Sequence, residues 1–388
     1  MPRVVLLIID GLGCGSQEDA HLYGDEGCNT LGHVVNRERP HLPNLTAMGL
    51  GHILPLDEVP AVPAPTAAYG RMREVSAGKD STTGHWELAG VVLKRPFPTY
   101  PHGFPPKVID AFCRISGVDG VLANAPWSGT AVIDAFGEEH LRTGRPIVYT
   151  SADSVFQVAA HEDVVPLPTL HDWCAAARER VLTDAHEVGR VIARPFTGVP
   201  GAFHRLNGQR KDFSAIPPDP HLPNVLLQAG VKTVSIGKVI DLFAGVGFSS
   251  YRKTTTNAEG ISQLLNALAG LDSGFLFVNL IDTDQLFGHR NDPAGFARSL
   301  EEFDRALPAI LGKLRADDVL IITGDHGNDP TTPGSDHTRE FVPVLVYPVG
   351  KAVGQDIGLR TSFRDVAASV ASLWGLPDIF DGHSFLIG

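Results

Sequence analysis

Short runs of consecutive apolar residues, many of them β-branched, recur along the chain, and an acidic residue follows each run within two positions. The first run covers 4–9 and leads directly into Asp10, and later runs cover 275–281 and 319–323. A strand that is apolar at every position is buried on both faces, which is typical of a parallel sheet covered by helices. An amphipathic stretch beginning at Asp292 separates the last two runs. This alternation predicts an α/β fold, with a mostly parallel sheet flanked by helices.

Two proline-dense stretches divide the chain. They cover 95–106 and 217–223, and such stretches often connect domains because proline disfavours the interiors of helices and sheets. A chain of 388 residues also exceeds what one small core usually holds. We therefore expect a core domain formed by 1–96 and 213–388, with a smaller α/β domain, 97–212, inserted into it.

The composition excludes several classes of function. Charged residues make up 20% and hydrophobic residues 43% of the chain, which is ordinary for a globular protein. The formal net charge of -12 disfavours nucleic acid and anionic membrane surfaces as partners. No apolar run is long enough to span a membrane, the N-terminal run is too short for a signal peptide, and the four cysteines form no C-x-x-C pair. These features predict a cytoplasmic protein.

Three clusters of Asp and His follow the predicted strands. In open α/β sheets, ligands collect beyond the carboxyl ends of the strands. An isolated Asp at such a position is often a turn residue, but an adjacent Asp and His after a buried strand, with a second His in the next loop, are unusual. The clusters supply three carboxylates and three imidazoles, which suit Mn²⁺, Zn²⁺ or Mg²⁺. The candidate metal ligands are Asp10, Asp284, His289, Asp325, His326 and His337.

The charge of such a site indicates its chemistry. Three carboxylates contribute about three negative charges, and two divalent ions contribute roughly four positive charges. The positive charge that is left uncompensated attracts a phosphate or an ionised hydroxyl. Two ions about 3.5–4 Å apart can stabilise both the attacking and the leaving oxygen of an in-line displacement. The pattern therefore favours phosphoryl transfer.

The segment 78–87, GKDSTTGHWE, offers a nucleophile. Its residues Ser81, Thr82 and Thr83 each carry a hydroxyl whose pKa a bound metal can lower. Strings rich in Ser and Thr are also common in turns, and composition alone does not choose among the three hydroxyls. His85, in the same string, is interpreted as a structural or surface residue.

Several strings, in this order along the chain, closely resemble the phosphopentomutase family of the alkaline phosphatase superfamily. The most specific are GKDSTTGHWE, TGDHGNDP and DHTRE, and the resemblance extends in register from Ile8 to about Glu340. It implies an alkaline-phosphatase-like core, with the inserted domain 97–212 as a cap that covers the substrate.

The resemblance also implies a metal centre with two Mn²⁺ ions, Mg²⁺ and Zn²⁺ being less favoured. One ion would be held by Asp284, His289 and His337. The other would be held by Asp10, Asp325 and His326, with the oxygen of the nucleophile completing its shell.

By the same resemblance the nucleophile is Ser81, at a position where the family pattern has Thr. Arginine suits a phosphate because its donors form a fork, and a carboxylate suits sugar hydroxyls. The side chains that match the family's substrate contacts are Ser151, Asp153, Arg194, Arg210 and Lys238.

The implied reaction moves a phosphoryl group within a pentose phosphate. Phosphorylated Ser81 would donate its group to the sugar, giving a bisphosphate intermediate, and would then take back the other group. Ribose 1-phosphate or 2-deoxyribose 1-phosphate would thus be interconverted with the 5-phosphate, with glucose 1,6-bisphosphate or a similar sugar bisphosphate as activator. The resemblance places such an enzyme in nucleoside salvage and pentose phosphate catabolism, as a monomer or weak homo-oligomer.

Two other functions use the same residues. One is a metal-dependent phosphatase or phosphodiesterase on the same core, and the other is a non-catalytic metal-binding protein. The string at 78–87 and the motifs in 97–212 favour the mutase over the hydrolase. The presence of every ligand together with a nucleophile argues against an inert site.

Overall fold

The computed structural model of the chain consists of two compact units. The larger is formed by Met1–Pro96 with Pro217–Gly388, and the smaller by Phe97–Ile216. The segment 97–212, predicted as an inserted domain, lies within the smaller unit. The structure describes residues 1–151, 154–348, 354–377 and 379–386.

An eight-stranded sheet forms the centre of the larger unit, in the order β10-β9-β11-β1-β12-β13-β2-β14. The middle strand β1 pairs in parallel with β11 on one side and with β12 on the other. The strands β12, β13 and β2 pair antiparallel with one another in turn, so the sheet is mixed but mostly parallel. The strands are β1 Arg3–Ile9, β2 Ala68–Met72, β9 Thr233–Ile236, β10 Ser250–Arg252, β11 Gly274–Leu280, β12 Val319–Thr323, β13 Val342–Pro348 and β14 Asp356–Arg360.

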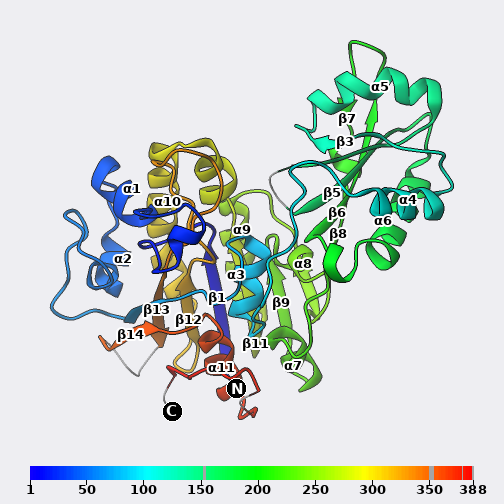
Figure 1. Cartoon of the computed structure of the whole chain (residues 1–388). Coiled ribbons are helices and arrows are strands. Elements are labelled where there is room, and N and C mark those ends of the chain that lie inside the picture. Colours follow the sequence, from blue (N-terminus) through cyan, green and yellow to red (C-terminus); the bar gives the residue numbers. More distant parts are fainter. Residues whose placement is uncertain (152–153, 349–353, 378, 387–388) are drawn as a thin grey trace. The chain divides into compact units, whose positions relative to one another are not determined.

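Helices cover both faces of this sheet (Figure 1). On one face, alternate residues of β1 pack with α1, α2, α9 and α10 in a single apolar core. The other face of β1 is equally buried, and α7 and α8 contact β9 and β11, with α3 and α11 packed beside them. This two-sided burial explains why β1, β11 and β12 are apolar at nearly every position, as the sequence predicts. The helices are α1 Thr30–Glu38, α2 Pro43–Met48, α3 Ser81–Leu88, α7 Leu222–Gln228, α8 Val239–Leu242, α9 Asn257–Gly270, α10 Pro293–Leu311 and α11 Asp365–Ser372.

The smaller unit is an α/β layer of its own. Its strands run in the order β3-β4-β5-β6-β7, and β8 pairs with β6. Helices α4 and α6 pack on one face, and α5 packs on the other. The elements are α4 Pro106–Ser116, β3 Leu122–Pro126, α5 Ala131–Thr143, β4 Ile147–Thr150, β5 Val155–His161, α6 Leu167–Arg180, β6 Arg190–Thr197, β7 His204–Arg205 and β8 Lys211–Ser214.

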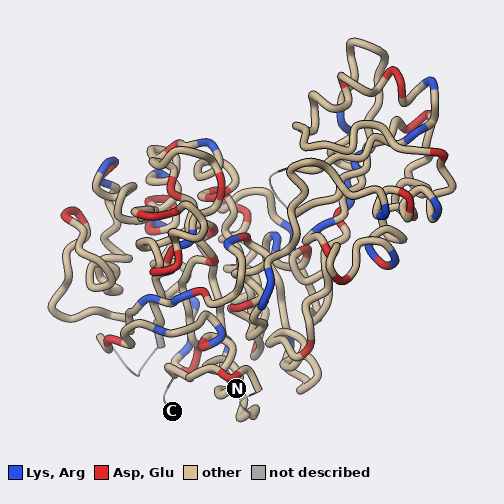
Figure 2. The backbone as a smooth tube through the Cα atoms, viewed as in Figure 1, with Lys and Arg blue, Asp and Glu red and all other residues tan. Residues whose placement is uncertain are grey.

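Charged residues are spread over both units. Figure 2 shows acidic and basic residues interspersed along the backbone of each. Among the described residues, no helix is both long enough and apolar enough to cross a membrane.

Candidate metal centre and nucleophile

The parallel pairing of β11, β1 and β12 brings the carboxyl ends of the three strands to one edge of the sheet. Asp10 follows β1, and its backbone N–H donates to the carbonyl of Leu280 at the end of β11 (3.1 Å). Asp325 follows β12 after one glycine, and Asp284 lies four residues beyond β11. The three predicted carboxylates therefore share one site, although Asp10 and Asp325 are more than 300 residues apart in the sequence.

Two groups of side chains at this edge have the spacing of metal ligands. One is Asp284, His326 and His337, and the other is Asp10, Asp325 and His326; all are buried, and the ligand atoms within each group lie within 4.8 Å of one another. His326 is common to both groups. This differs from the predicted division, which gave His326 to one ion only.

His289, the sixth predicted ligand, lies beside the first group. Its Nε2 atom is 3.3 Å from Oδ2 of Asp284, and its ring centre is 4.7 Å from that of His337. The Nδ1 atom of His289 is 2.6 Å from the carbonyl oxygen of Ser335, which leaves Nε2 directed at the site. The structure therefore brings all six predicted ligands together.

Several buried atoms of the site match the requirements of a cation. Oδ1 of Asp10, Oδ2 of Asp325 and Nε2 of His337 form no hydrogen bond of good geometry in the described part of the chain, although groups of opposite charge lie within ion-pair distance of each. Burying such atoms without a partner is costly, and a metal ion supplies the missing interaction. Carboxylate and imidazole donors of this kind fit two divalent ions of the Mn²⁺, Mg²⁺ or Zn²⁺ type.

In the metal-free protein, protons take the place of the missing positive charge. Burial lowers the pKa of His326, but the nearby carboxylates, Asp325 above all, outweigh it and raise that pKa to about 10. A hydrogen bond to Asp284 raises the pKa of His289 to about 9. Burial raises the pKa of Asp325, but His326 and the other imidazole neighbours overcome this and hold it well below its ordinary value. Metal binding must therefore displace protons from the histidines.

The nucleophile string lies at the N-terminus of α3, against this edge. Asp80 caps the helix: its Oδ1 accepts hydrogen bonds from the N–H groups of Thr82 (2.9 Å) and Thr83 (3.2 Å). Its Oδ2 accepts from the hydroxyl of Thr83 (2.6 Å), so that hydroxyl is already engaged. The close approach of α3 to the metal loop requires Gly84, because a Cβ atom there would overlap the carbonyl oxygen of Asp325.

Ser81 is the first residue of α3, and its hydroxyl faces the candidate ligands. Its Oγ atom is 3.1 Å from Nε2 of His326 and accepts a hydrogen bond from Nζ of Lys238 (2.8 Å). The Lys238 ammonium also forms an ion pair with Asp10. Within the described residues, no comparable contact joins Thr82 or Thr83 to the metal groups, so the geometry favours Ser81 among the three hydroxyls.

His85 belongs to the site, although the sequence suggested only a structural or surface role. It is fully buried, and its Nδ1 atom is 3.0 Å from Oδ2 of Asp325. Its Nε2 atom is 3.1 Å from the side-chain nitrogen of Asn279, which donates to Oδ2 of Asp10 (2.9 Å). His85 thus orients two candidate ligands. Its place four residues after Ser81, on the same face of a helix, is the only signal in the sequence that pointed to this role.

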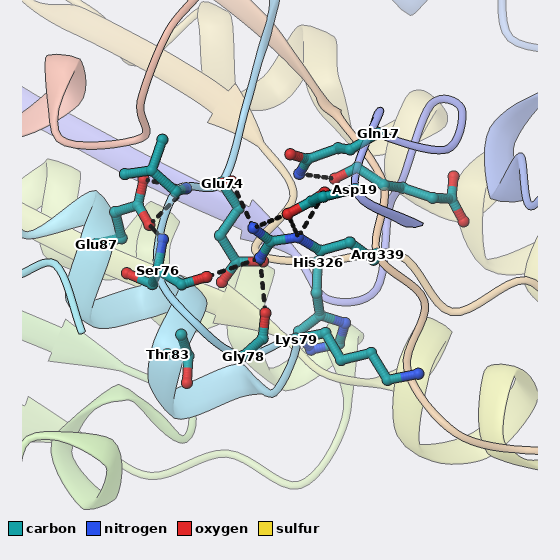
Figure 3. A network of polar contacts seen from close by, with 12 residues as sticks. Gln17, Asp19, Glu74, Ser76, Gly78, Lys79, Thr83, Glu87, His326 and Arg339 are labelled. Carbon is teal, nitrogen blue, oxygen red and sulfur yellow. Dashed lines mark hydrogen bonds and ion pairs between the residues drawn. The ribbon is translucent and has the colours of Figure 1, made fainter. Parts of the chain in front are cut away.

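Arg339 connects the loop that carries His337 to the segment that precedes Ser81 (Figure 3). Its Nη1 donates to Oε2 of Glu74 (3.0 Å) and to the carbonyl oxygens of Ser76 (2.9 Å) and Gly78 (2.7 Å). These bonds fix the backbone shortly before Ser81.

The same loop is connected to Lys79 through the carboxylate of Asp25. The backbone N–H of Arg339 donates to Oδ2 of Asp25 (2.8 Å), and Lys79 pairs with the same carboxylate (2.9 Å). Nothing in the composition of the DHTRE string singles out this Arg, because its partners lie about 260 residues away in the sequence.

The remaining predicted substrate contacts belong to the smaller unit. Ser151 follows β4, Arg194 lies in β6, and Arg210 lies directly before β8. Asp153 lies outside the described residues. Lys238 is the exception, since it belongs to the larger unit and lies beside Ser81.

The fold and the site together are those of a metalloenzyme: the model of the Metalloenzyme superfamily matches residues 2–378. Curated relatives then narrow the family. Phosphopentomutase of Caldanaerobacter subterraneus subsp. tengcongensis is 50% identical over 386 residues, covering 100% of this chain and 98% of that protein. Phosphopentomutase of Anaeromyxobacter sp. strain K is 53% identical over 386 residues, covering 99% of this chain and 98% of that protein. The chain belongs to the phosphopentomutase family.

The resemblance seen in the sequence strings is thus confirmed, as is the prediction of an isomerase on an alkaline-phosphatase-like α/β core. Among solved structures, phosphoglycerate mutase of Leishmania mexicana covers 98% of this chain and 96% of that chain, at 15% identity and a TM-score of 0.49. That likeness is too low to support an argument about function.

Proposed function

We propose that the chain interconverts ribose 1-phosphate or 2-deoxyribose 1-phosphate with the corresponding 5-phosphate, through a phosphorylated Ser81 and a sugar bisphosphate. The observation that carries this proposal is the position of Ser81. Its hydroxyl lies between His326 of the candidate metal groups and the ammonium of Lys238, at the N-terminus of a capped helix.

The surroundings of Ser81 suit a phosphoryl group. The N-terminus of α3 carries a partial positive charge, and Lys238 adds a full one next to the oxygen. Two divalent ions bound at the candidate groups would lower the pKa of the Ser81 hydroxyl and neutralise charge on the transferred phosphoryl group. His85 and Asn279 hold Asp325 and Asp10 in position for those ions.

The transfer itself leaves the charges and atoms in balance. A free sugar hydroxyl attacks the phosphorus on Ser81, the bond from phosphorus to Oγ breaks, and Oγ regains the proton that the sugar loses. After the bisphosphate reorients, Ser81 Oγ attacks the other phosphoryl group and the same exchange runs in reverse. A sugar bisphosphate such as glucose 1,6-bisphosphate would phosphorylate Ser81 in the first place.

We further propose two Mn²⁺ ions as the natural occupants. Three of the six candidate ligands are imidazoles, whereas Mg²⁺ prefers oxygen ligands throughout. A mixed set of carboxylates and imidazoles suits Mn²⁺ or Zn²⁺ better. The predicted division, with His289 beside Asp284 and His337, is compatible with the contact between His289 and Asp284.

The smaller unit is proposed to act as a cap. A phosphorylated Ser81 must react with the sugar and not with water, and a cover that excludes water serves that purpose. Ser151, Asp153, Arg194 and Arg210 are proposed to contact the sugar phosphate from this unit. We place the enzyme in the cytoplasm, in nucleoside salvage and pentose phosphate catabolism, as a monomer or weak homo-oligomer.

Turnover tests the proposal. The full chain would be loaded with Mn²⁺, given ribose 1-phosphate and a catalytic amount of glucose 1,6-bisphosphate, and assayed for both ribose 5-phosphate and free phosphate. The expected result is ribose 5-phosphate with almost no free phosphate, and neither product from a Ser81→Ala variant. Stoichiometric free phosphate would instead identify a hydrolase, and no product of either kind would reject a pentose phosphate as substrate.

A further inference from the structure

Asn328 is a buried residue beside the metal groups that the proposed reaction does not use. It is 1% exposed and stands two positions after His326, in the loop that follows β12. Its side-chain nitrogen donates a hydrogen bond of 2.7 Å to Oδ1 of Asp284. Asp284 belongs to the segment that follows β11, so one side chain connects the two segments that carry most of the candidate ligands.

The acceptor determines how the amide of Asn328 is turned. An ionised carboxylate only accepts hydrogen bonds, and of the two ends of an amide only the NH₂ group donates. The nitrogen must therefore face Asp284. A hydrogen bond to a charged acceptor is stronger than one between neutral groups, and its loss inside a protein is correspondingly costly.

The backbone of Asn328 is held independently of its side chain. Its N–H group donates to the carbonyl oxygen of Gly11 (3.0 Å) and lies 3.1 Å from the hydroxyl oxygen of Thr30. That hydroxyl donates in turn to Oε1 of the buried Glu340 (2.6 Å). The Cα atom from which the amide extends is thus fixed by the N-terminal part of the chain.

Two glycines confine the side chain of Asn328. A Cβ atom at Gly288 would lie 2.6 Å from both Cγ and Nδ2 of Asn328, which is closer than real contacts allow. A Cβ atom at Gly11, where φ is +74°, would lie 3.1 Å from Cβ of Asn328 and 3.3 Å from Oδ1 of Asp284. The amide is therefore packed in place, and it needs no further ordering when an ion binds.

The chemistry of an amide sets Asn328 apart from the other neighbours of Asp284. Nε2 of His289 lies 3.3 Å from Oδ2 of Asp284, and Nε2 of His337 lies 3.4 Å from Oδ1. Both imidazoles are candidate ligands, so each must direct a lone pair at an ion once it binds. The amide nitrogen of Asn328 has no lone pair to offer and can keep its hydrogen bond to the carboxylate. It also adds no charge to the site.

The other group of candidate ligands has an equivalent asparagine. Asn279 is also 1% exposed, and its side-chain nitrogen donates to Oδ2 of Asp10 (2.9 Å). Each group therefore contains one carboxylate that is held by a buried amide from another segment. The two asparagines contact different carboxylates, which allows their effects to be separated by experiment.

We propose that Asn328 is a positioning residue for one of the two metal ions: its amide orients the Asp284 carboxylate for the ion that Asp284 would hold with His337. Groups that orient a ligand in this way commonly change metal affinity by about 10- to 100-fold when they are removed. The effect should be confined to that ion, because Asn328 has no side-chain hydrogen bond to Asp10, Asp325 or His326 among the described residues. The inference concerns metal binding and does not depend on which phosphate ester the protein converts.

Calorimetry of the full, metal-free chain with Mn²⁺ as the probe, with a competing chelator for tight binding, tests this role. Asn328→Ala and Asn328→Leu both lack the donor; the first adds no bulk, and the second roughly keeps the volume. We expect each to bind one of two Mn²⁺ ions about 10- to 100-fold more weakly and the other within about twofold of wild type. Thermal unfolding in the presence of chelator verifies that the variants are folded, and Asn328→Ala carries the test if the leucine does not fit.

A second background identifies the affected ion. Asp284→Ala should leave a single tightly bound Mn²⁺, the one assigned to Asp10, Asp325 and His326. In that background Asn328→Ala should change the affinity of the remaining ion by less than about twofold, because the carboxylate through which Asn328 acts is gone. Asn279→Ala should weaken the remaining ion by about tenfold or more, which shows that this ion responds to the loss of its own amide.

Asn44→Ala is the matched control. The Asn44 side-chain nitrogen also donates to a buried carboxylate, Oδ2 of Asp304 (2.9 Å), but Asp304 is not a candidate metal ligand. The control should lower the thermal unfolding temperature and still bind both Mn²⁺ ions as the wild type does.

The outcomes separate this inference from the proposed function. Two Mn²⁺ ions bound with wild-type affinity by folded Asn328→Ala would overturn it. Equal weakening of both ions, or weakening of the remaining ion in the Asp284→Ala background, would also overturn it, because either result indicates a general role in the loop. A wild type that binds fewer than two ions would remove its basis. If the predicted pattern is found but no pentose phosphate is turned over, the role of Asn328 stands and the proposed function falls.

Discussion

At the residue scale, Ser81 shows how one hydroxyl is distinguished from its neighbours. Three consecutive residues offer an OH group, but Asp80 engages Thr83 and caps the helix. Ser81 stands at the start of α3, with its oxygen near His326 and Lys238. Capping thus occupies the hydroxyl of Thr83, and the contacts with His326 and Lys238 distinguish Ser81 from Thr82.

We expect Ser81→Ala to lower mutase turnover by at least about a thousandfold, because no other described hydroxyl has a hydrogen bond to a candidate ligand atom of the metal groups. Ser81→Thr should retain activity, since it keeps the oxygen on the same helix position. Intact mass measured after incubation with glucose 1,6-bisphosphate reports the phosphorylated fraction. The neighbouring Thr82→Ala variant is the control and should still be phosphorylated; phosphate on the Ser81→Ala protein would contradict the assignment.

The histidines of the site lead to a prediction about pH. In the metal-free protein the pKa of His326 is about 10 and that of His289 about 9, both above the ordinary value of 6.5. At pH 7 each metal-free histidine is therefore protonated, and Mn²⁺ must displace these protons. Manganese affinity should rise with pH between 6 and 9, by up to about tenfold per pH unit for each proton displaced. Calorimetry in buffers of different ionisation enthalpy counts the protons, and a heat that is independent of the buffer would contradict this.

The same pKa shifts give the stability of the metal-free chain the opposite pH dependence: whereas manganese affinity rises with pH, this stability falls. A histidine whose folded pKa is raised binds more protons when folded, so its stabilising contribution is complete below pH 6.5. That contribution is lost as pH rises through about 9 to 10. Thermal unfolding of protein treated with a chelator should therefore shift to lower temperature between pH 7 and pH 10. Protein saturated with Mn²⁺ is the control and should show a smaller shift.

At the element scale, Arg339 joins β13 and its preceding loop to the segment before α3. The guanidinium is buried and donates to side-chain and backbone oxygens of residues 74–78. A second carboxylate, Asp19, accepts from Nη2 (2.9 Å), so the fork is used on both sides. Lysine keeps the charge at this position but not the planar fork.

Arg339→Lys should lower the free energy of unfolding by about 2 kcal/mol, because several of its buried acceptors lose their donors. Phosphorylation of Ser81 should slow in the same variant, since the backbone at Gly78 is no longer held. Urea unfolding and the rate of phosphoenzyme formation measure the two effects. Arg364→Lys is a matched control, because Arg364 pairs with the exposed Asp381 (3.0 Å) and should change stability by less than about 0.5 kcal/mol. Equal stability of the two variants would contradict the role of Arg339.

At the scale of the whole molecule, the chain runs through a complete second unit, Phe97–Ile216, between two parts of one core. We expect replacement of 97–216 by a short flexible linker to shift any remaining activity from transfer to slow hydrolysis, since water then reaches the phosphorylated serine. The ratio of free phosphate to ribose 5-phosphate measures this shift, with the Ser81→Ala form of the same shortened chain as the blank. An unchanged ratio would show that the smaller unit does not protect the intermediate.

Much of the core and of the metal centre could be predicted from the sequence. Strands buried on both faces are apolar at nearly every position, so 4–9, 275–281 and 319–323 are visible as runs, and the candidate ligands follow them. The proline-dense stretches mark the boundaries between the two units, because proline restricts its own backbone and disfavours helix and sheet interiors. The family could be named because strings such as GKDSTTGHWE combine several of these local requirements in one place.

Other parts of the site were decided only by the tertiary structure. The role of His85 depends on Asp325, and that of Arg339 depends on Glu74. Nothing in the sequence around Arg339 indicates its neighbours, because they come from other parts of the chain. The sharing of His326 by the two candidate ligand groups depends on distances alone. Secondary-structure propensity, helix capping and the burial pattern depend on residues that are close in the sequence, so they can be predicted from it. Pairing of polar side chains acts across the sheet, and it exists only once the strands are in register.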